Sequence, residues 1–432
     1  MSADRRSLNA LYSDNRLKLG VFGANVSNGC AATTAPGHLV MNWPNSRDIV
    51  TIADRAGFEA LVPVARWKGF GGATNFNGTC YETLAWAAGM GAVTNHASIF
   101  CTTHVPTIHP IVAAKQCTTV DHLTGGRFAL NIVCGWYSQE LRMFGLQTMD
   151  HDTRYAYADE WVEVIRKLWT MEEEFDYEGK FFNIEKGFHQ PKPLQLPHPP
   201  IMNAGSSGIG ARFAAKHADI AFIGFYEDSL ADGKAKLTEM RRIGREDFSR
   251  EFQIWTSCRV VCRPTEKEAK EYAHYYIYEK GDFGAVETII GEQGRKDPNL
   301  PPEVYERMKV RLAAGWGGYP LVGTPEQIVE ELIALTKTGL DGVVLSWVNY
   351  HDEMRQWIAE VMPLVEQAGL RQPHKTCMGL FLSSGCYRVL LTVLCSERER
   401  PFFIPSPAIQ FPERAEGGQG TETVAKLGGL PP

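Results

Sequence analysis

The chain has 432 residues, of which 44% are hydrophobic and 22% charged, a balance typical of a globular protein with a large core. Its net charge of −6 and pI of about 6.1 exclude the strongly basic character of a nucleic-acid-binding protein. The ten cysteines are scattered without a CxxC pair, which favours a reducing, cytoplasmic compartment. The first 16 residues are polar and predict no secretory signal.

Apolar runs alternate with helical stretches through the first half of the chain. The runs predict strands over residues 17–22, 59–65, 97–103 and 128–134, and helices over 46–56, 82–93, 111–123 and 154–169. Ser46 is the expected cap of the first helix. The run 128–134 is apolar except at Asn131, as in a parallel strand that is covered on both faces. An amide there must be hydrogen-bonded, so Asn131 is either a satisfied core residue or a ligand contact.

The same alternation continues through the second half. It predicts strands over 200–204, 220–225, 252–262 and 342–348, and helices over 209–217, 230–243, 266–280 and 354–368. Eight strand–helix units in one unbroken run predict an α/β fold, a closed (β/α)8 TIM barrel with insertions, with a doubly wound open sheet as the alternative. The insertions are residues 175–199, with a hairpin-like start, and residues 281–324, with a helix over 302–314. Both are expected to be lids or binding loops.

The composition changes after Gln372. We expect the barrel to span residues 17–370 and residues 371–432 to form an appended, poorly ordered C-terminal tail. Residues 377–396 are apolar over about the length of a membrane span, but Arg388 near the centre argues against one. The sequence therefore predicts no membrane segment.

In a barrel of this kind the active site lies at the C-terminal ends of the strands. The segment 203–208, Asn-Ala-Gly-Ser-Ser-Gly, runs from a strand into a helix and offers backbone N–H groups to a phosphate. The alternative is an ordinary helix cap by Ser206 or Ser207. Arg154, at the start of a helix, could bind the same phosphate in a bidentate manner. Its alternative is a solvated charge or an ion pair with Asp152.

The sequence contains no evident acid–base pair. GxSxG and HExxH motifs are absent, and no acidic cluster has metal-ligand spacing, so no metal site is expected. His104 and His109 are expected to be core or loop histidines. A barrel with a phosphate cradle and no acid–base pair indicates that a cofactor supplies the chemistry.

Several motifs match one known family. They are RWKGFGG at 66–72, the segment 114–127, NIVCGW at 131–136, HDTRY at 151–155, NAGSS at 203–207 and LVGTPE at 321–326. With these motifs in chain order, residues 17–370 resemble the bacterial luciferase-like flavin monooxygenases. Within that superfamily, the GFGG loop and the NIVCGW strand are most similar to pyrimidine monooxygenases, followed by dimethyl-sulfone and alkanesulfonate monooxygenases.

The resemblance implies an FMNH2-dependent monooxygenase of a two-component system. Such an enzyme takes reduced FMN from a separate NAD(P)H:flavin reductase and inserts one oxygen atom of O2 into a small pyrimidine-, amide-, sulfone- or sulfonate-like substrate. A homo-oligomer, dimer or tetramer, is expected. Two alternatives stay open, a deazaflavin-dependent dehydrogenase on the same fold and a non-catalytic flavin-binding paralogue.

The resemblance also assigns roles to individual residues. It implies flavin contacts from Ala65, Arg66, Asn131 and Glu140, and a phosphate site made by Arg154, Tyr155 and Ser207. Thr102 and Asn131 are the expected catalytic residues, since both could donate hydrogen bonds where O2 reacts. Pyrimidine monooxygenases have Lys at the position of Arg66. The expected apolar walls, each of which could equally be core, are Trp67, Phe70, Trp136 and Trp347.

Overall fold

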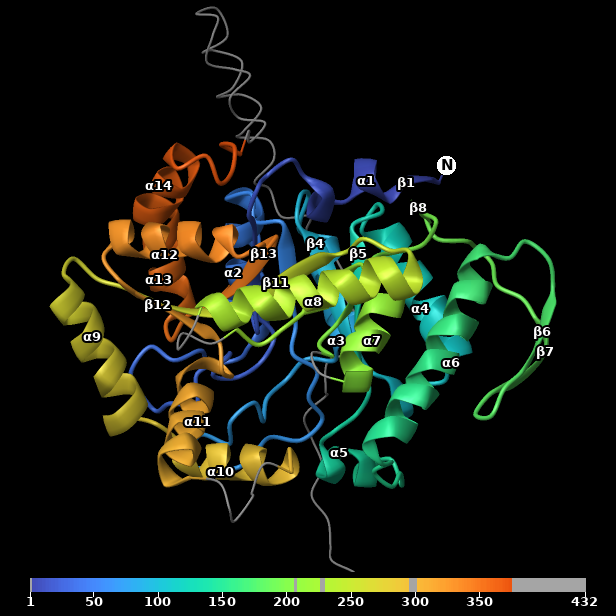
Figure 1. The fold of residues 1–432 in the computed structure, drawn as a ribbon, viewed down its shortest axis with the longest axis horizontal. Helices are drawn as coiled ribbons and strands as arrows, with labels where there is room; N and C mark the ends of the chain where they lie inside the picture. The colour runs from blue at the N-terminus through green and yellow to red at the C-terminus, as the bar shows by residue number, and fades with distance from the viewer. Residues whose placement is uncertain (1, 206–207, 226–229, 295–300, 375–432) are drawn as a thin grey trace, which may run out of the picture. The chain divides into compact units, whose positions relative to one another are not determined.

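Eight parallel strands close into a barrel in the computed structural model, which describes residues 2–205, 208–225, 230–294 and 301–374 (Figure 1). The barrel strands are β2 (Lys18–Phe22), β3 (Ala60–Val62), β4 (Ser98–His104), β5 (Phe128–Val133), β9 (Ile201–Asn203), β10 (Ile220–Phe222), β11 (Gln253–Cys262) and β13 (Gly342–Ser346). Neighbours pair in this order, and the pairings of β11 with β10 and of β13 with β11 and β2 complete the ring. The predicted (β/α)8 barrel is therefore confirmed, and the open sheet is excluded.

Helices surround the barrel, as Figure 1 shows. They are α2 (Trp43–Arg55), α3 (Thr83–Gly91), α4 (Pro110–Leu123), α6 (His151–Thr170), α7 (Gly208–His217), α8 (Leu230–Phe248), α9 (Glu266–His274), α12 (Pro325–Lys337), α13 (Tyr350–Gln356) and α14 (Met362–Gln367). None of the helices in the described ranges is long and apolar enough to cross a membrane.

One strand–helix pair was not predicted from the sequence. β12 (Tyr319–Gly323) pairs with the outer half of β11, and α12 follows it directly. The expected insertion 281–324 therefore ends in regular structure. The five-residue strand contains Pro320, which lacks a backbone donor and weakens the strand signal.

The start of α2 also differs from the prediction. The helix begins at Trp43, and the side chain of Asn42 accepts from the backbone N–H of Asn45. Ser46 is instead fully buried, where it donates to the carbonyl of Ala24 (2.6 Å) and accepts from the indole of Trp86 (2.8 Å). Ser46 therefore links the helix to its neighbours by buried hydrogen bonds and does not cap the helix.

The two expected insertions take different positions. Residues 175–199 contain the antiparallel hairpin β6 (Phe175–Glu178) and β7 (Asn183–Gly187), as the sequence indicated, and then β8 (Gln195–Leu196). The later insertion contributes α10 (Phe283–Glu292) and α11 (Pro302–Gly315), which lie at the opposite end of the barrel from α1 (Arg5–Leu8) in Figure 1.

The helices α10 and α11 form a roof that is attached at two points. Asp282 accepts hydrogen bonds from the backbone N–H and the hydroxyl of Thr74, both at 2.7 Å. Glu292 accepts from the backbone N–H (3.0 Å) and the hydroxyl (2.7 Å) of Ser138. Between them, apolar side chains of both helices pack against Phe70 and other aromatic residues. These contacts hold the roof over the C-terminal ends of the strands.

The N-terminal segment closes the other end of the barrel. β1 (Ala3–Asp4) pairs with β8, and Arg5 makes two hydrogen bonds to Asp219, at 2.9 and 2.7 Å. Leu11 is fully buried in the inner core layer with Phe100 and Trp255. The compact unit therefore begins before residue 17. Because the N-terminal segment covers this end of the barrel, a site is expected at the opposite end, beneath the roof.

The chain between Gly369 and His374 ties the last helix back to the barrel. Arg371 and Glu59 form an ion pair at 3.3 Å, with about 1% of each side chain exposed. The backbone N–H of Gln372 donates to Asn15 (2.7 Å). The expected tail lies from residue 375 onward outside the described residues.

We predict that truncation after Gln372 leaves the free energy of unfolding within about 1 kcal/mol of wild type, because the Arg371–Glu59 pair is retained. Truncation after Ala368 leaves Glu59 buried without its partner and is expected to cost about 3–5 kcal/mol. Urea unfolding of both truncated chains tests this difference. Equal stability of the two would contradict the account, and so would loss of folded protein on truncation after Gln372.

Candidate active site

A cavity of about 230 Å³ opens at the C-terminal ends of the barrel strands, beneath the roof. Its polar lining residues are Arg66, Thr102, His104, Asn131, Ser257 and Gln293, and its apolar lining residues include Ala65, Phe22, Trp136, Met202, Phe222 and Trp316. The structure therefore brings Ala65, Arg66, Thr102 and Asn131 together, although the sequence separates them by up to 66 residues.

Strand register places Thr102 beside Asn131. The two residues are Cα partners in the β4–β5 ladder, so both side chains point to the same face of the sheet. Asn131 donates from Nδ2 to the Thr102 hydroxyl (3.1 Å), and that hydroxyl donates to the carbonyl of Pro63 (2.6 Å). The hydroxyl proton of Thr102 is thus used in the hydrogen bond to the backbone carbonyl of Pro63. The hydroxyl oxygen accepts from Asn131 and so fixes the orientation of the Asn131 amide.

Asn131 lines the barrel-mouth cavity, and the oxygen of its amide is the atom that the Thr102 contact leaves unused. Its Oδ1 is buried and has no hydrogen-bond partner among the described residues. A buried acceptor without a partner costs about 1–3 kcal/mol, so such an atom in a cavity wall indicates a ligand donor. The sequence left open whether Asn131 is a core residue or a ligand contact, and this geometry favours the ligand contact.

Arg66 is a buried cation at the edge of the same cavity. Its Nη1 lies 3.1 Å from Glu140 Oε2, and its guanidinium lies 4.7 Å from the ring centroid of Phe70. Its Nε is buried without a partner in the described structure. Arg66 therefore keeps one donor, Nε, that no described residue uses, while its charge is balanced by Glu140.

Glu140, from α5 (Ser138–Met143), holds the loop that follows β3. Its Oε1 accepts from the backbone N–H groups of Trp67 (2.6 Å) and Lys68 (3.1 Å), while Oε2 pairs with Arg66. Only about 2% of its side chain is exposed. Both oxygens are occupied by this loop, so Glu140 positions Arg66 for any ligand in the cavity.

Replacing Glu140 with alanine should lower the free energy of unfolding by about 3–5 kcal/mol, because Arg66 would stay buried without its partner. Glu140→Gln keeps an acceptor for the backbone N–H groups of the loop, so it should lower the free energy of unfolding by less. Denaturant unfolding of both variants measures the difference. A Glu140→Ala protein as stable as wild type would show that the loop does not depend on this carboxylate.

His104, which the sequence predicts to be a core or loop residue, lines the site. It lies two residues after Thr102 on β4, so both face the cavity. Burial and the charge of Arg66 lower the pKa of His104 to about 3, and its Nδ1 lies 3.5 Å from Glu140. The imidazole is therefore neutral near pH 7. The period-two pattern of β4 was the signal that could have placed it in the site.

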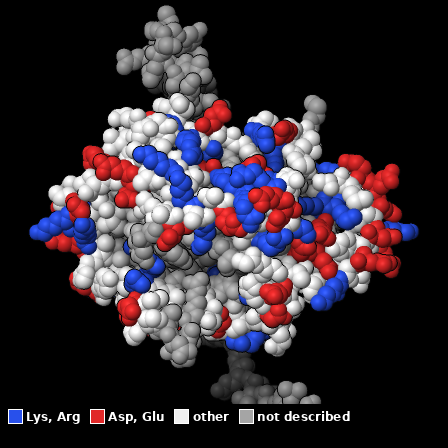
Figure 2. Space-filling view, in the orientation of Figure 1, with Lys and Arg blue, Asp and Glu red and all other residues white. Residues whose placement is uncertain are grey.

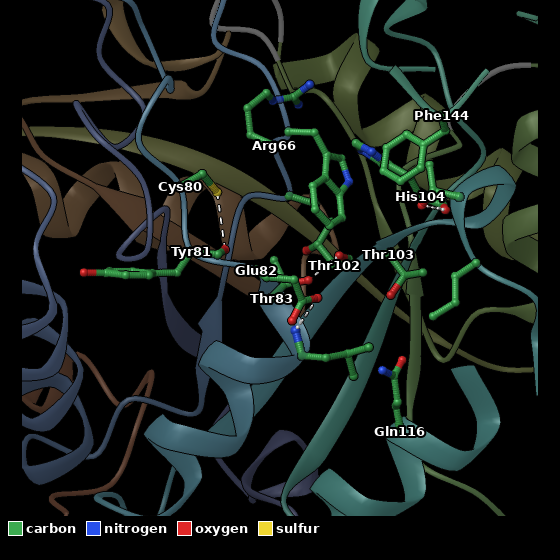
Figure 3. A pocket seen from close by; sticks show the side chains of 15 residues that line it. Arg66, Cys80, Tyr81, Glu82, Thr83, Thr102, Thr103, His104, Gln116 and Phe144 are labelled. Atoms are coloured by element: carbon green, nitrogen blue, oxygen red, sulfur yellow. Dashed lines mark hydrogen bonds between the residues drawn. The ribbon is translucent and has the colours of Figure 1, made fainter. Parts of the chain in front are cut away.

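A second cavity, of about 380 Å³, is lined by Arg66 and Thr102 as well (Figure 3). Ala65, Arg66, Thr102 and His104 line both cavities. Cys80 also lines the second one, where burial raises the pKa of its thiol to about 12. A protonated thiol is a weak nucleophile, so the arrangement offers no covalent chemistry at this wall.

Arg154 and Tyr155 lie together in the first turn of α6. Arg154 donates from Nη1 to the carbonyl of Gly135 (2.6 Å), and its Nε is buried without a partner in the described structure. The suggested Arg154–Asp152 pair does not form, because Asp152 lies 3.1 Å from His151 instead. Arg154 is therefore half-buried, and no carboxylate of the described residues pairs with it.

The structure describes the expected phosphate-binding segment except for residues 206–207, and the described part is closely packed. A Cβ at Gly210 would lie 2.6 Å from the hydroxyl oxygen of Tyr155, so this hydroxyl touches the first turn of α7. The backbone N–H of Gly205 donates to Asn203 (2.8 Å). Ser207 lies outside the described residues. The Tyr155 hydroxyl therefore lies at the start of α7, and the N-terminus of a helix is a place that favours an anion.

Of the four aromatic residues expected to form apolar walls, two line a cavity and two do not. Trp136 lines the barrel-mouth cavity and Trp67 lines the second cavity, where its ring packs against Phe144 at 5.2 Å. Phe70 packs behind Arg66. Trp347 is buried in the core beside Trp357, so it forms no wall of the site. Within the described ranges, no group of three or more His, Cys, Asp or Glu residues could hold a metal ion.

Comparison with known proteins identifies the family of this chain. Residues 18–342 match the family model of the luciferase-like monooxygenases. The chain therefore belongs to the luciferase-like monooxygenase family, and the family and enzyme class predicted from the sequence are confirmed.

Two relatives illustrate the range of the family. An FMNH2-dependent dimethylsulfone monooxygenase of Pseudomonas putida is 28% identical over 358 residues, covering 81% of this chain and 96% of that protein. Pyrimidine monooxygenase RutA of Allorhizobium ampelinum is 27% identical over 358 residues, with the same coverage.

Solved structures share the fold at lower identity. Long-chain alkane monooxygenase LadA superposes with a TM-score of 0.73 at 22% identity, covering 84% of this chain and 94% of that one. An F420-dependent secondary alcohol dehydrogenase superposes with a TM-score of 0.58 at 17% identity, covering 81% of this chain and 99% of that one. These similarities show the barrel alone.

Proposed function

We propose that this chain is the oxygenase component of a two-component monooxygenase. It would take reduced FMN from an NAD(P)H:flavin reductase and insert one oxygen atom of O2 into a small organic substrate. The named relatives support this proposal, since one is an FMNH2-dependent monooxygenase and the other a pyrimidine monooxygenase. The observation that carries it is that Arg66 and Asn131 line one roofed cavity and that each has a buried polar atom without a described partner, Nε and Oδ1.

The residues present fit a flavin mononucleotide. Ala65, Arg66 and Asn131 would contact the ring system, with Glu140 acting through Arg66. Arg154 and Tyr155, together with Ser207, would hold the phosphate. When bound, reduced FMN supplies the electrons that activate O2.

The chain's own residues would prepare the site for that chemistry. The Asn131 Oδ1 would accept a hydrogen bond from an N–H group, and Arg66 Nε would donate one, which fixes the orientation of a planar ring. Thr102 would hold the Asn131 amide in place. The roof of α10 and α11 would exclude water, which strengthens these polar contacts.

The test combines the purified chain, FMN, a flavin reductase, NADH and isotopically labelled O2 with uracil, a dialkyl sulfone and an alkanesulfonate. We expect a labelled oxygen in the product of one substrate class, measured by mass spectrometry. A chain without affinity for FMN in either redox state would refute the proposal.

We further propose that the protein acts in the cytoplasm, where NAD(P)H is available to its reductase, and that it assembles as a homo-oligomer. Gel filtration with light scattering measures the assembly state. A monomer at micromolar concentration would refute the second part.

A further inference from the structure

Four residues line both the barrel-mouth cavity and the second cavity. They are Ala65, Arg66, Thr102 and His104. The second cavity is the larger of the two, at about 380 Å³ against about 230 Å³. The proposed function gives a role to the first three of these residues, and His104 is left without one.

Three threonine hydroxyls that line the second cavity already use their protons. Thr83 donates to the carbonyl of Thr102 (2.7 Å), and the Thr102 hydroxyl donates to the carbonyl of Pro63 (2.6 Å). Thr107 donates to the carbonyl of His104 (2.8 Å). A hydroxyl has a single O–H donor, so these side chains can accept a hydrogen bond from a ligand but have none to donate.

The imidazole of His104 differs from these hydroxyls because its ring is not hydrogen-bonded. In Figure 3, His104 follows Thr102 and Thr103 along β4. The residue is 6% exposed, and neither ring nitrogen makes a hydrogen bond to a described residue. Nδ1 lies 3.5 Å from Glu140 Oε2, which favours the tautomer with the proton on Nδ1. Nε2 then has a lone pair that no described residue uses, and buried polar atoms are normally hydrogen-bonded.

The surroundings of His104 keep its ring neutral. Burial and the charge of Arg66 lower the pKa of His104 to about 3, so Nε2 stays an acceptor near neutral pH. Figure 2 shows acidic and basic side chains intermixed, so on the face drawn there no large patch of one sign adds to the field of Arg66. The field that lowers this pKa also disfavours a cation beside the ring. The donor that His104 receives is therefore expected on an uncharged group.

We infer that His104 determines specificity in this site: its Nε2 accepts a hydrogen bond from an uncharged O–H or N–H group of the substrate, which lies in the second cavity. This inference rests on the proposed function, because reduced FMN is assigned to the barrel-mouth cavity. The second cavity also offers apolar surface to the rest of the molecule, from Leu84, Ile108 and Phe144. A molecule that carries only acceptors, such as a dialkyl sulfone, would leave Nε2 without a partner.

The experiment compares benzyl alcohol with benzyl methyl ether, in which a methyl group replaces the hydroxyl proton. Isothermal titration measures the Kd of each probe for the full chain loaded with FMN. We expect the alcohol to bind roughly three- to tenfold more tightly, the value of one hydrogen bond. His104→Phe keeps a ring without an acceptor and should abolish this preference, while His104→Gln keeps an acceptor and should retain part of it. His122→Phe is the matched control, because His122 is exposed on α4 and lines neither cavity.

Four results would overturn the inference. The ether could bind as tightly as the alcohol, or neither probe could bind to the FMN-loaded chain. The preference for the alcohol could survive in a folded His104→Phe protein, or this variant could weaken FMN binding instead, which would assign the imidazole to the flavin. Titration of the wild-type chain with FMN distinguishes failure of the inference from failure of the proposed function. Absent FMN affinity refutes the proposed function itself, whereas retained FMN affinity without preference for the alcohol refutes only the role of His104.

Discussion

Replacing Asn131 with alanine is expected to lower kcat roughly 10²-fold, the effect typical of removing one preorganised polar contact at a reacting centre. The change removes the only described acceptor that is buried and unpartnered at this point of the β5 strand. It also frees Thr102 from its hydrogen bond to Nδ2 (3.1 Å). Single-turnover kinetics with reduced FMN, O2 and the substrate identified from the panel measure the loss.

Threonine variants separate the contact from simple packing. Thr102→Val removes the group that orients Asn131 and should reduce kcat less than Asn131→Ala. Thr103→Val is the matched control, because the neighbouring hydroxyl packs against Cys101 (3.3 Å) and does not line the barrel-mouth cavity. An Asn131→Ala protein with wild-type kcat would refute the role assigned to Asn131.

Replacing Arg154 with alanine is expected to weaken FMN binding by about 1.5–3 kcal/mol, or roughly 10- to 150-fold in Kd, the value of a charge-assisted hydrogen bond. Its guanidinium is anchored to Gly135 and retains a buried Nε without a described partner. The Kd for FMN follows from quenching of flavin fluorescence.

Riboflavin lacks the phosphate, so its affinity distinguishes a loss of phosphate binding from a general loss of flavin binding in this variant. Its affinity should be the same for Arg154→Ala and wild type. Arg142→Ala, an exposed arginine on α5, should leave both affinities unchanged. An unchanged Kd for FMN in Arg154→Ala would contradict the phosphate assignment.

The barrel could be predicted because its signals are local. Each strand is a short apolar run and each helix has its own period, so eight repeats favour a closed barrel over an open sheet without knowledge of contacts. The sequence predictions were wrong where tertiary packing overrides the local sequence pattern. Asn42 and Pro44 begin α2 earlier than Ser46 suggested, and the Pro320 strand β12 pairs only because β11 extends beyond the barrel.

The site could be predicted only in part. Thr102 and Asn131 follow from their places at strand ends, and the register makes them neighbours. Gln293 and Trp316 reach the cavity from the roof, whose position depends on the contacts of Asp282 and Glu292. Such long-range hydrogen bonds leave no periodic pattern, so these residues had no signal in the sequence.

Glu140 shows what the structure adds to the family resemblance. The resemblance implies a flavin contact, and the structure shows in addition that both carboxylate oxygens bind the loop at Arg66, Trp67 and Lys68. The position is important to the site in either case. Its role in this chain is to hold a buried cation at the cavity wall.

The most direct test of the account is an anaerobic titration of the full chain with reduced FMN and, side by side, with the reduced deazaflavin cofactor. The cavity and cradle described above predict that reduced FMN binds more tightly, and that Arg154→Ala weakens this binding. Preference for the deazaflavin would instead identify a hydride-transferring dehydrogenase on the same barrel. Absence of binding by both cofactors would contradict a flavin site at the barrel mouth.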